Sequence, residues 1–159
     1  MTVAGWIAGI ALLAVLFDGW YEQQYNPNTS PDFRTLASGD VEIVLHANRR
    51  GHYVTNGKIN GQEAVFLLDT GATGVAVPET LAREWGLIRG ERIQMQTANG
   101  VSVGYLTVLD SVSIGPLVQR DVRGVIAPGF LSDEVLLGMS FLRHLNLQQS
   151  NGKLTLRQH

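Results

Sequence analysis

The segment around Asp69 contains the residue types from which a water-activating site can be built. An apolar stretch, Phe66 to Leu68, ends at the carboxylate of Asp69, and Thr70 and Gly71 follow directly. A carboxylate at the end of a rigid strand is held firmly, and a nearby glycine lets another backbone come close. Two such carboxylates about 3 Å apart share one proton. The ionised one can then take a proton from water attacking a carbonyl carbon, while the protonated one assists the developing oxyanion.

The residues after Asp69 are expected to support its carboxylate. The Thr70 hydroxyl is placed to hydrogen-bond across a pair of such loops and so fix their geometry. The N–H of Gly71 is placed to donate to the carboxylate itself. We therefore treat Asp69 as the candidate catalytic residue and Thr70, Gly71 and Ala72 as the supporting loop.

Strands joined by glycine turns are predicted to hold this loop in place. Three strand-like pairs each flank an Asn-Gly dipeptide, a two-residue hairpin signal because both positions tolerate positive φ. The turns are Asn60–Gly61, Asn99–Gly100 and Asn151–Gly152. The second hairpin is predicted to pair residues 93–98 with residues 101–109. A further half-buried strand is indicated by the alternation of apolar and other residues over 41–46.

Helices are predicted at only two places. Pro78 suits a first helical position and Gly86 a left-handed stop, so a helix is expected from Pro78 to Trp85. A second, short helix is expected to begin near Ser140. Several hairpins with one or two short helices predict a mainly β fold, a small closed or partly closed barrel.

From about residue 52 to 157 the chain resembles the retropepsin-like family of single-lobe aspartic peptidases, which includes retroviral proteases and bacterial membrane-anchored relatives. The motif Asp69-Thr70-Gly71-Ala72 matches the active-site signature of this family. The apolar pair and glycine ahead of the second helix match another family element, a strand that packs beside the active-site loop. Its residues are Leu136, Leu137 and Gly138. The resemblance implies an acid-protease-like barrel and an aspartic endopeptidase acting on a protein or peptide.

The resemblance also implies a flap, a mobile hairpin that covers the bound peptide. The second predicted hairpin falls at the corresponding position, and its flap residues are Thr97, Ala98, Asn99, Gly100 and Val101.

One chain supplies only one catalytic motif. No other aspartate is followed by Thr-Gly or Ser-Gly; the others are Asp18, Asp32, Asp40, Asp110, Asp121 and Asp133. Because the chemistry needs two carboxylates, the pair is expected to form across the two-fold axis of a homodimer, as Asp69 and Asp69 of a partner. By resemblance, the C-terminal hairpin near Leu154 and Leu156 is expected to contribute to the dimer sheet.

Composition argues against several other classes. The net charge is −2 and the only basic pair is Arg49–Arg50, so no nucleic-acid partner is expected. There is no Cys, and the 4 His have neither His-x-x-x-His spacing nor clustered carboxylates. We therefore expect no disulfide, no metal and no cofactor. Ser140 lacks the second glycine of a nucleophile elbow, and no phosphate-binding loop occurs.

The first 17 residues are uncharged and strongly apolar. As a helix they would span roughly 26 Å, and Trp20 and Tyr21 would follow at the membrane interface. A cleaved signal peptide and a buried core helix are alternatives. The first lacks a basic start and a cleavage site, and the second is normally amphipathic. We therefore expect a retained single-pass transmembrane anchor over residues 1–17.

Location follows from the same segment. The flank after the anchor carries Asp18 and Glu22 and no basic residue before Arg34. Because cytoplasmic flanks are usually basic, we expect the inner membrane of a Gram-negative bacterium with the domain in the periplasm. The polar, proline-containing residues 18–40 are expected to form a tether, and residues 41–159 the peptidase domain.

Other functions remain open at this point. The same barrel can serve as a catalytically silent, membrane-anchored dimerisation or peptide-binding module. It can also be a cell-envelope domain in which Asp69 only caps a turn, a common role for Asp before a glycine-containing loop.

Overall fold

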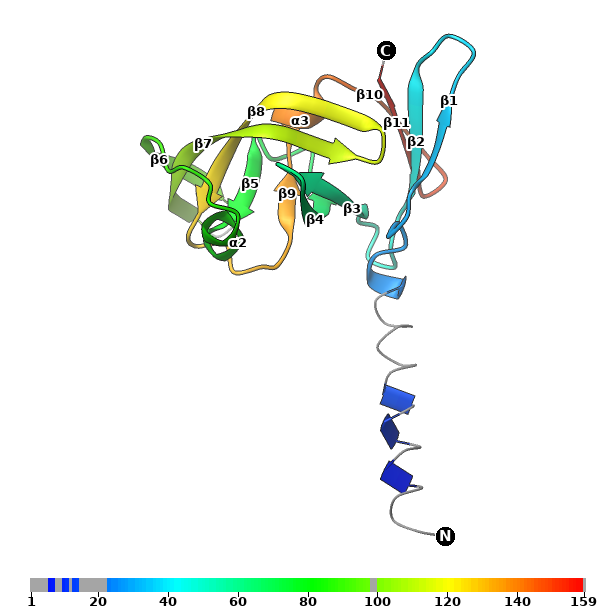
Figure 1. Ribbon diagram of the computed structural model, residues 1–159, viewed down its shortest axis with the longest axis horizontal. Coiled ribbons are helices and arrows are strands. Elements are labelled where there is room, and N and C mark those ends of the chain that lie inside the picture. Colours follow the sequence, from blue (N-terminus) through cyan, green and yellow to red (C-terminus); the bar gives the residue numbers. More distant parts are fainter. Residues whose placement is uncertain (1–5, 8–9, 12, 15–22, 98–99, 159) are drawn as a thin grey trace.

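The computed structural model describes residues 6–7, 10–11, 13–14, 23–97 and 100–158. Strands dominate this part of the chain and form two sheets, with two short helices packed on the larger one (Figure 1). The strands are β1 Asp32–Thr35, β2 Val41–His46, β3 Val54–Ile59, β4 Gln62–Leu68, β5 Val75–Pro78, β6 Arg92–Thr97, β7 Gly100–Ile114, β8 Leu117–Ala127, β9 Val135–Leu137, β10 Asn146–Ser150 and β11 Lys153–Gln158. The helices are α2 Glu79–Glu84 and α3 Met139–Leu142.

The larger sheet is a partly closed barrel. Its seven strands run in the order β3-β4-β9-β5-β8-β7-β6, and β3 also pairs with β7. That extra pairing joins Lys58 to Ser113 and Ile59 to Val112, so the sheet curls back on itself. The long strand β7 makes this possible, because it pairs with β6 at one end and β3 near the other. The predicted mainly β, partly closed barrel with short helices is confirmed.

Two of the predicted hairpins have the backbone conformation that Asn-Gly turns favour. Asn60 and Gly61 have φ of 50° and 81°, and Asn151 and Gly152 have φ of 49° and 72°. Positive φ at both turn positions matches the right-handed twist of the strands they join. The second hairpin is present as β6 and β7, and Thr97 pairs with Gly100. Ala98 and Asn99 lie outside the described residues.

The strand predicted to end at residue 109 is longer than the sequence indicated. It continues to Ile114, turns at Gly115 and Pro116, and returns as β8. Gly115 has a φ of 52°, a left-handed conformation that glycine adopts without strain. The continuation is stabilised because Val112, Ile114 and Leu117 are fully buried.

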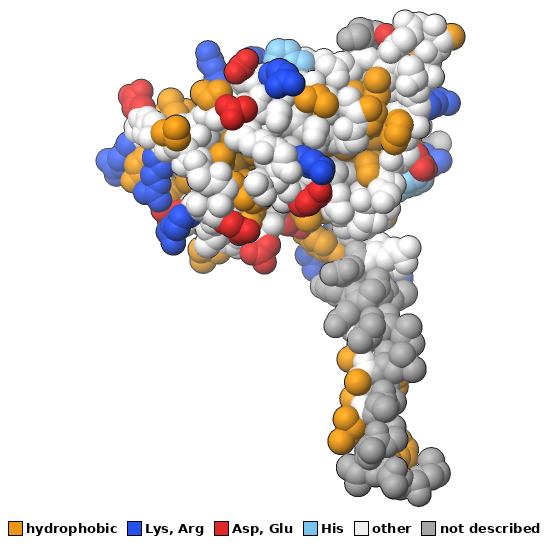
Figure 2. Space-filling view, viewed as in Figure 1, with side chains coloured by type: hydrophobic (Ala, Val, Ile, Leu, Met, Phe, Trp, Pro, Cys, Tyr) orange, Lys and Arg blue, Asp and Glu red, His pale blue; other side chains and the backbone are white. Residues whose placement is uncertain are grey.

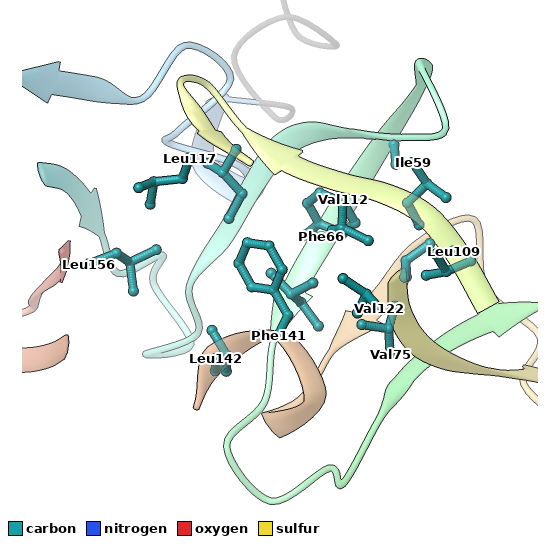
Figure 3. Packing of buried hydrophobic residues seen from close by; sticks show 14 of the residues in the cluster. Ile59, Phe66, Val75, Leu109, Val112, Leu117, Val122, Phe141, Leu142 and Leu156 are labelled. Atoms are coloured by element: carbon teal, nitrogen blue, oxygen red, sulfur yellow. The ribbon is translucent and has the colours of Figure 1, made fainter. Parts of the chain in front are cut away.

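One hydrophobic core connects both sheets. Phe66 from β4, Leu109 from β7, Val122 from β8 and Phe141 from α3 converge inside the barrel (Figure 3). Leu156 of the smaller sheet belongs to the same cluster. Fully burying a large apolar side chain contributes about 1.5–3 kcal/mol relative to leaving it exposed. The two sheets are therefore parts of one packed unit.

The smaller sheet contains both ends of the folded chain, in the order β1-β2-β11-β10. β1 pairs antiparallel with β2 from Asp32↔Val44 to Thr35↔Val41. The prediction of a tether over residues 18–40 is therefore wrong for its later part, since that part forms a strand of the domain. The polar composition was misleading because an edge strand whose residues are all exposed needs few apolar side chains.

The residues just before β1 are also part of the fold. Asn28 is 2% exposed and its side-chain Nδ2 donates to the carbonyl oxygens of His46 at 2.9 Å and Val54 at 2.7 Å. Its Oδ1 accepts from the His46 N–H at 2.7 Å. His46 ends β2 and Val54 begins β3, so one asparagine side chain joins the two sheets.

The predicted anchor lies largely outside the described residues. Within the described part, no helix is long and apolar enough to cross a membrane. Trp6, Ile7, Ile10 and Leu13 are exposed. The anchor therefore stays a prediction.

Candidate active site

Asp69 directly follows β4 and lies beside β9, the neighbouring strand of the larger sheet. β4 runs parallel to β9, with Leu68 opposite Leu137, and the Asp69 N–H donates to the Leu137 carbonyl at 3.2 Å. β9 lies between β4 and β5 in the sheet. The loop 69–74 therefore leaves β4, passes the end of β9 and returns on its other side as β5. This crossing fixes both ends of the loop to the same strand.

Gly138 allows the crossing because the loop passes directly over it. A Cβ at this position would lie 2.3 Å from the Gly74 carbonyl oxygen and 2.5 Å from that of Ala72. Both distances are far below ordinary contact, and the atoms are backbone. The N–H of Met139 donates to the Ala72 carbonyl oxygen at 2.8 Å. The Leu-Leu-Gly element thus needs its glycine for space, not for a special φ.

Ser140 is a positioning residue that sequence reasoning missed. Its N–H donates to the Thr73 carbonyl at 2.9 Å, and its Oγ accepts from the Val75 N–H at 3.1 Å. The same hydroxyl donates to the Arg123 carbonyl at 2.7 Å. One serine therefore ties the active-site loop to α3 and β8. From the sequence, Ser140 marked only the start of a short helix and was rejected as a nucleophile. Its place two residues after Gly138 is the signal for its structural role.

The carboxylate of Asp69 faces outward. Its Oδ1 accepts from the Gly71 N–H at 2.8 Å, and Asp69, Thr70 and Gly71 are all exposed. The backbone is held by Leu137 and Ala72 while the carboxylate itself remains accessible. A rigid backbone carrying an accessible carboxylate is what a shared two-aspartate site requires. In the described part of the chain, no group of three or more acidic or histidine residues is arranged to hold a metal ion.

The predicted flap corresponds to the end of the β6–β7 hairpin. The Thr97 Oγ1 donates to the Gly100 carbonyl at 2.8 Å, and Val101 is 69% exposed. The hairpin approaches the segment before β9, since a Cβ on Gly129 would lie 3.2 Å from the Ser102 Oγ. Its role as a cover stays a prediction.

The C-terminal hairpin consists of β10 and β11. β11 has neighbours on both sides, β2 and β10, and Leu154 and Leu156 are buried within the chain. The contribution of this hairpin to a dimer sheet stays a prediction, and β10 is its edge strand. In the described residues, β1 and β10 are the strands at the edges of the smaller sheet.

Comparison with known proteins agrees with this geometry. Residues 55–144 match the family model described as gag-polyprotein putative aspartyl protease. The crystal structure of a retropepsin-like aspartic protease from Rickettsia conorii superposes with a TM-score of 0.64 at 28% identity, covering 80% of this chain and 96% of that one. The fold and the site thus define a single-lobe, retropepsin-like domain. The chain belongs to the gag-polyprotein putative aspartyl protease family.

Two curated relatives are bacterial proteins of undescribed activity. An uncharacterized protein in the cobV 5′ region of Sinorhizobium sp. is 34% identical over 127 residues, which cover 77% of this chain and 54% of that protein. The uncharacterized protein RP867 of Rickettsia prowazekii (strain Madrid E) is 32% identical over 105 residues, covering 64% and 44%. The chain thus spans about half the length of these relatives.

Proposed function

We propose that this protein is an aspartic endopeptidase whose active site forms between two copies of the chain. The observation that carries the proposal is the outward-facing Asp69 carboxylate on a loop fixed at both ends of the β4–β9–β5 crossing. The chain has one Asp-Thr-Gly motif, so a second carboxylate must come from a partner. Family membership supports the same reading.

The chemistry follows from two Asp69 carboxylates sharing one proton. The ionised carboxylate removes a proton from a water molecule between them as that water attacks the peptide carbonyl carbon. The protonated carboxylate donates its proton toward the carbonyl oxygen, which becomes a hydroxyl of the tetrahedral intermediate. The carbon–nitrogen bond then breaks as the amine nitrogen receives the proton that the first carboxylate took from water. The second carboxylate takes a proton from a hydroxyl of the intermediate, which leaves as the carboxylic acid product. The Gly71 N–H holds each carboxylate in place throughout.

We also propose a location for this activity. The uncharged residues 1–17 form a retained single-pass anchor in the inner membrane, and the domain lies in the periplasm. The substrates are then periplasmic or membrane-proximal proteins. Confinement to a membrane raises the local concentration of the chain and so favours the dimer.

Reporter fusions to the C-terminus test on which side of the membrane the domain lies, since alkaline phosphatase is active only after export. An inactive phosphatase fusion with an active cytoplasmic reporter contradicts this placement.

Mixing of subunits tests the shared site. Wild-type full-length chain in detergent is assayed on a peptide library with increasing amounts of Asp69→Asn chain. If each dimer needs two carboxylates, an equal mixture that exchanges freely leaves about a quarter of dimers with two wild-type subunits. Activity per wild-type chain should therefore fall by about half, and further with excess variant.

Two controls accompany the mixing experiment. An equal amount of Asp110→Asn chain, altered at an exposed aspartate of β7, should leave activity unchanged. Dilution of wild-type chain through the monomer–dimer range should lower specific activity, because separate chains lack the second carboxylate. Activity that is independent of both dilution and the Asp69→Asn chain excludes a site shared between copies.

A further inference from the structure

A polar pocket lies between β8 and α3, apart from the Asp69 carboxylate. Its volume is about 360 Å³, and it is lined by Gln119, Arg120, Asp121, Val122, Arg123, Ser140, Arg143 and His144. On the face shown in Figure 2, Lys or Arg side chains and a His side chain lie at the upper edge of the domain, with Asp or Glu side chains among them. Neither catalysis nor the packing of the core accounts for this concentration of basic residues.

The three arginines of the pocket have no carboxylate partners. Elsewhere in the described chain, Arg34 and Arg157 bind Glu42, and Arg89 binds Glu79. Within the same described residues, Arg120, Arg123 and Arg143 form no ion pair within 4.0 Å, even though Asp121 lines the pocket with them. Three arginines against one aspartate leave the lining of the pocket with an excess of positive charge, which raises the local electrostatic potential and attracts anions.

The local backbone contributes to this arrangement. Asp121 has a φ of 52°, a left-handed conformation that is uncommon for a residue other than glycine. The two positions 120 and 121 are consecutively exposed, so the in–out alternation of β8 is interrupted there. Directly after α3, the Arg143 Nε donates to the His144 Nε2 at 3.3 Å, which orients the guanidinium group.

We propose that this pocket binds a phosphate group. Guanidinium groups donate parallel pairs of hydrogen bonds to oxyanions, and the fit to phosphate is specific as well as strong. A phosphate carries up to two negative charges on a compact group, so it can neutralise two arginines at once, whereas one carboxylate offers a single charge. The shared chemistry is that of a phosphate ester or free phosphate, and a phospholipid headgroup is one of its sources.

The position of the pocket joins a bound phosphate to the loop that carries Asp69. Ser140 lines the pocket and hydrogen-bonds to Val75 and Thr73 of the active-site loop and to the Arg123 carbonyl. A ligand held by Arg123 and Arg143 would contact the two elements that this serine connects. The binding proposal itself does not depend on Asp69 being catalytic, and its test needs no substrate.

The test is an NMR titration of the full-length chain in uncharged detergent with inorganic phosphate at constant ionic strength. We expect saturable shifts of the arginine Nε–Hε signals and of the Ser140 and Val75 amides. The double variant Arg123→Gln/Arg143→Gln should weaken binding at least about tenfold, because hydrogen bonds to charged groups are lost. Chloride at the same ionic strength should cause no saturable shift.

A matched double variant controls for the change in total charge. Arg83→Gln/Arg92→Gln removes two exposed arginines on α2 and β6, outside this pocket, and should leave phosphate affinity within about twofold. Should the pocket variant lose its folded spectrum, Arg123→Lys/Arg143→Lys keeps the charge but removes the guanidinium forks and should still weaken binding. Equal loss in both double variants, or phosphate shifts that never saturate, overturns the proposal.

Vesicles identify the source of the phosphate. Phosphatidic acid vesicles that displace inorganic phosphate from the wild-type chain, where phosphatidylcholine vesicles do not, assign a lipid headgroup. Saturable binding of inorganic phosphate that neither vesicle displaces assigns a soluble phosphate. Binding of an acidic glutamate peptide without any binding of phosphate contradicts the proposal, because it would assign a carboxylate ligand.

Discussion

The two sheets of this protein handle polar groups in opposite ways. In the barrel, the Asp69 carboxylate is exposed and its loop is held mainly by backbone groups of Ala72, Thr73 and Leu137. In the four-stranded sheet, the carboxylate of Glu42 is 2% exposed and is bound by Arg34 and Arg157. One carboxylate is exposed, as the proposed chemistry requires, whereas the other holds strands together.

This difference separates the candidate active site, in the barrel, from the smaller sheet. Because the backbone fixes the active-site loop, the Asp69 side chain can change without loss of packing. The smaller sheet gathers β1 and β11, which lie at opposite ends of the folded chain, through the buried carboxylate of Glu42, which binds an arginine from each. Substitutions there should reduce stability and affect cleavage only through unfolding. Four predictions test this division, from the largest expected effect to the smallest.

Replacing Asp69 with Asn should have the largest effect on activity and almost none on stability. Loss of the carboxylate that moves the proton should lower peptide cleavage by about a thousandfold or more. The amide oxygen still accepts from Gly71, and the side chain is exposed, so the free energy of unfolding should change by less than about 0.5 kcal/mol. Cleavage assays and urea unfolding measure the two effects. Retained cleavage would remove Asp69 from the mechanism.

Replacing Gly138 with Ala should lower both stability and activity. The new Cβ would overlap the carbonyl oxygens of Gly74 and Ala72, and forcing the loop away should cost about 3 kcal/mol. Gly74→Ala is the control, since a Cβ there lies no closer than 3.8 Å to another atom. Thermal unfolding of both variants makes the comparison. Equal stability of the two variants would mean that the loop over position 138 has room for a Cβ.

Replacing Asn28 with Ala should lower the stability of the fold where the smaller sheet joins the barrel. The change leaves the buried carbonyl of Val54 and the backbone groups of His46 without their side-chain partner, at a cost of about 2–3 kcal/mol. Removal of all residues before 41 should be more severe, because β1 is lost as well. Urea unfolding of Asn28→Ala and of a chain truncated at residue 41 measures both. Equal stability of the truncated chain and the full domain would show that the residues before 41 are only a tether.

Replacing Glu42 with Gln should have a smaller effect, and one that depends on pH. The pKa of Glu42 lies below its ordinary value of 4.5 because the hydrogen bond from Arg157 outweighs the opposing effect of burial, and Arg34 adds to it. The carboxylate therefore stabilises the fold above pH 4.5, and this contribution is lost as pH falls through the lower, folded-state pKa. At neutral pH the variant should lose about 1–2 kcal/mol.

The control for Glu42 is an exposed ion pair in the barrel. Glu63 binds Lys58 on the surface, so Glu63→Gln should cost less than about 0.5 kcal/mol at any pH. Urea unfolding between pH 3 and 7 follows both variants. A Glu42→Gln deficit that is constant across that range would show that ionisation of Glu42 does not contribute.

Much of the barrel was predictable because its signals are local. The Asn-Gly turns at 60–61 and 151–152 adopt positive φ at both positions, as the dipeptide favours. The helix expected from Pro78 to Trp85 appears as α2, bounded by those two residues as caps. The strand ending at Asp69 was visible as an apolar run before a turn. Each of these features depends on residues within a few positions of one another.

The sequence by itself thus determined the strands next to the three Asn-Gly turns, the turns themselves, and the single Asp-Thr-Gly motif on which the proposed shared site depends. Only the tertiary structure decided that Gly138 lies under the loop, that Ser140 ties the loop to β8, and that Asn28 joins the sheets. It also brought Arg120 and Arg123 of β8 to the same pocket as Arg143, which follows α3. The physical reason is that these contacts join segments far apart in the chain. Turn and strand preferences act over a few residues, whereas close backbone approach and buried polar pairing depend on how the whole barrel closes.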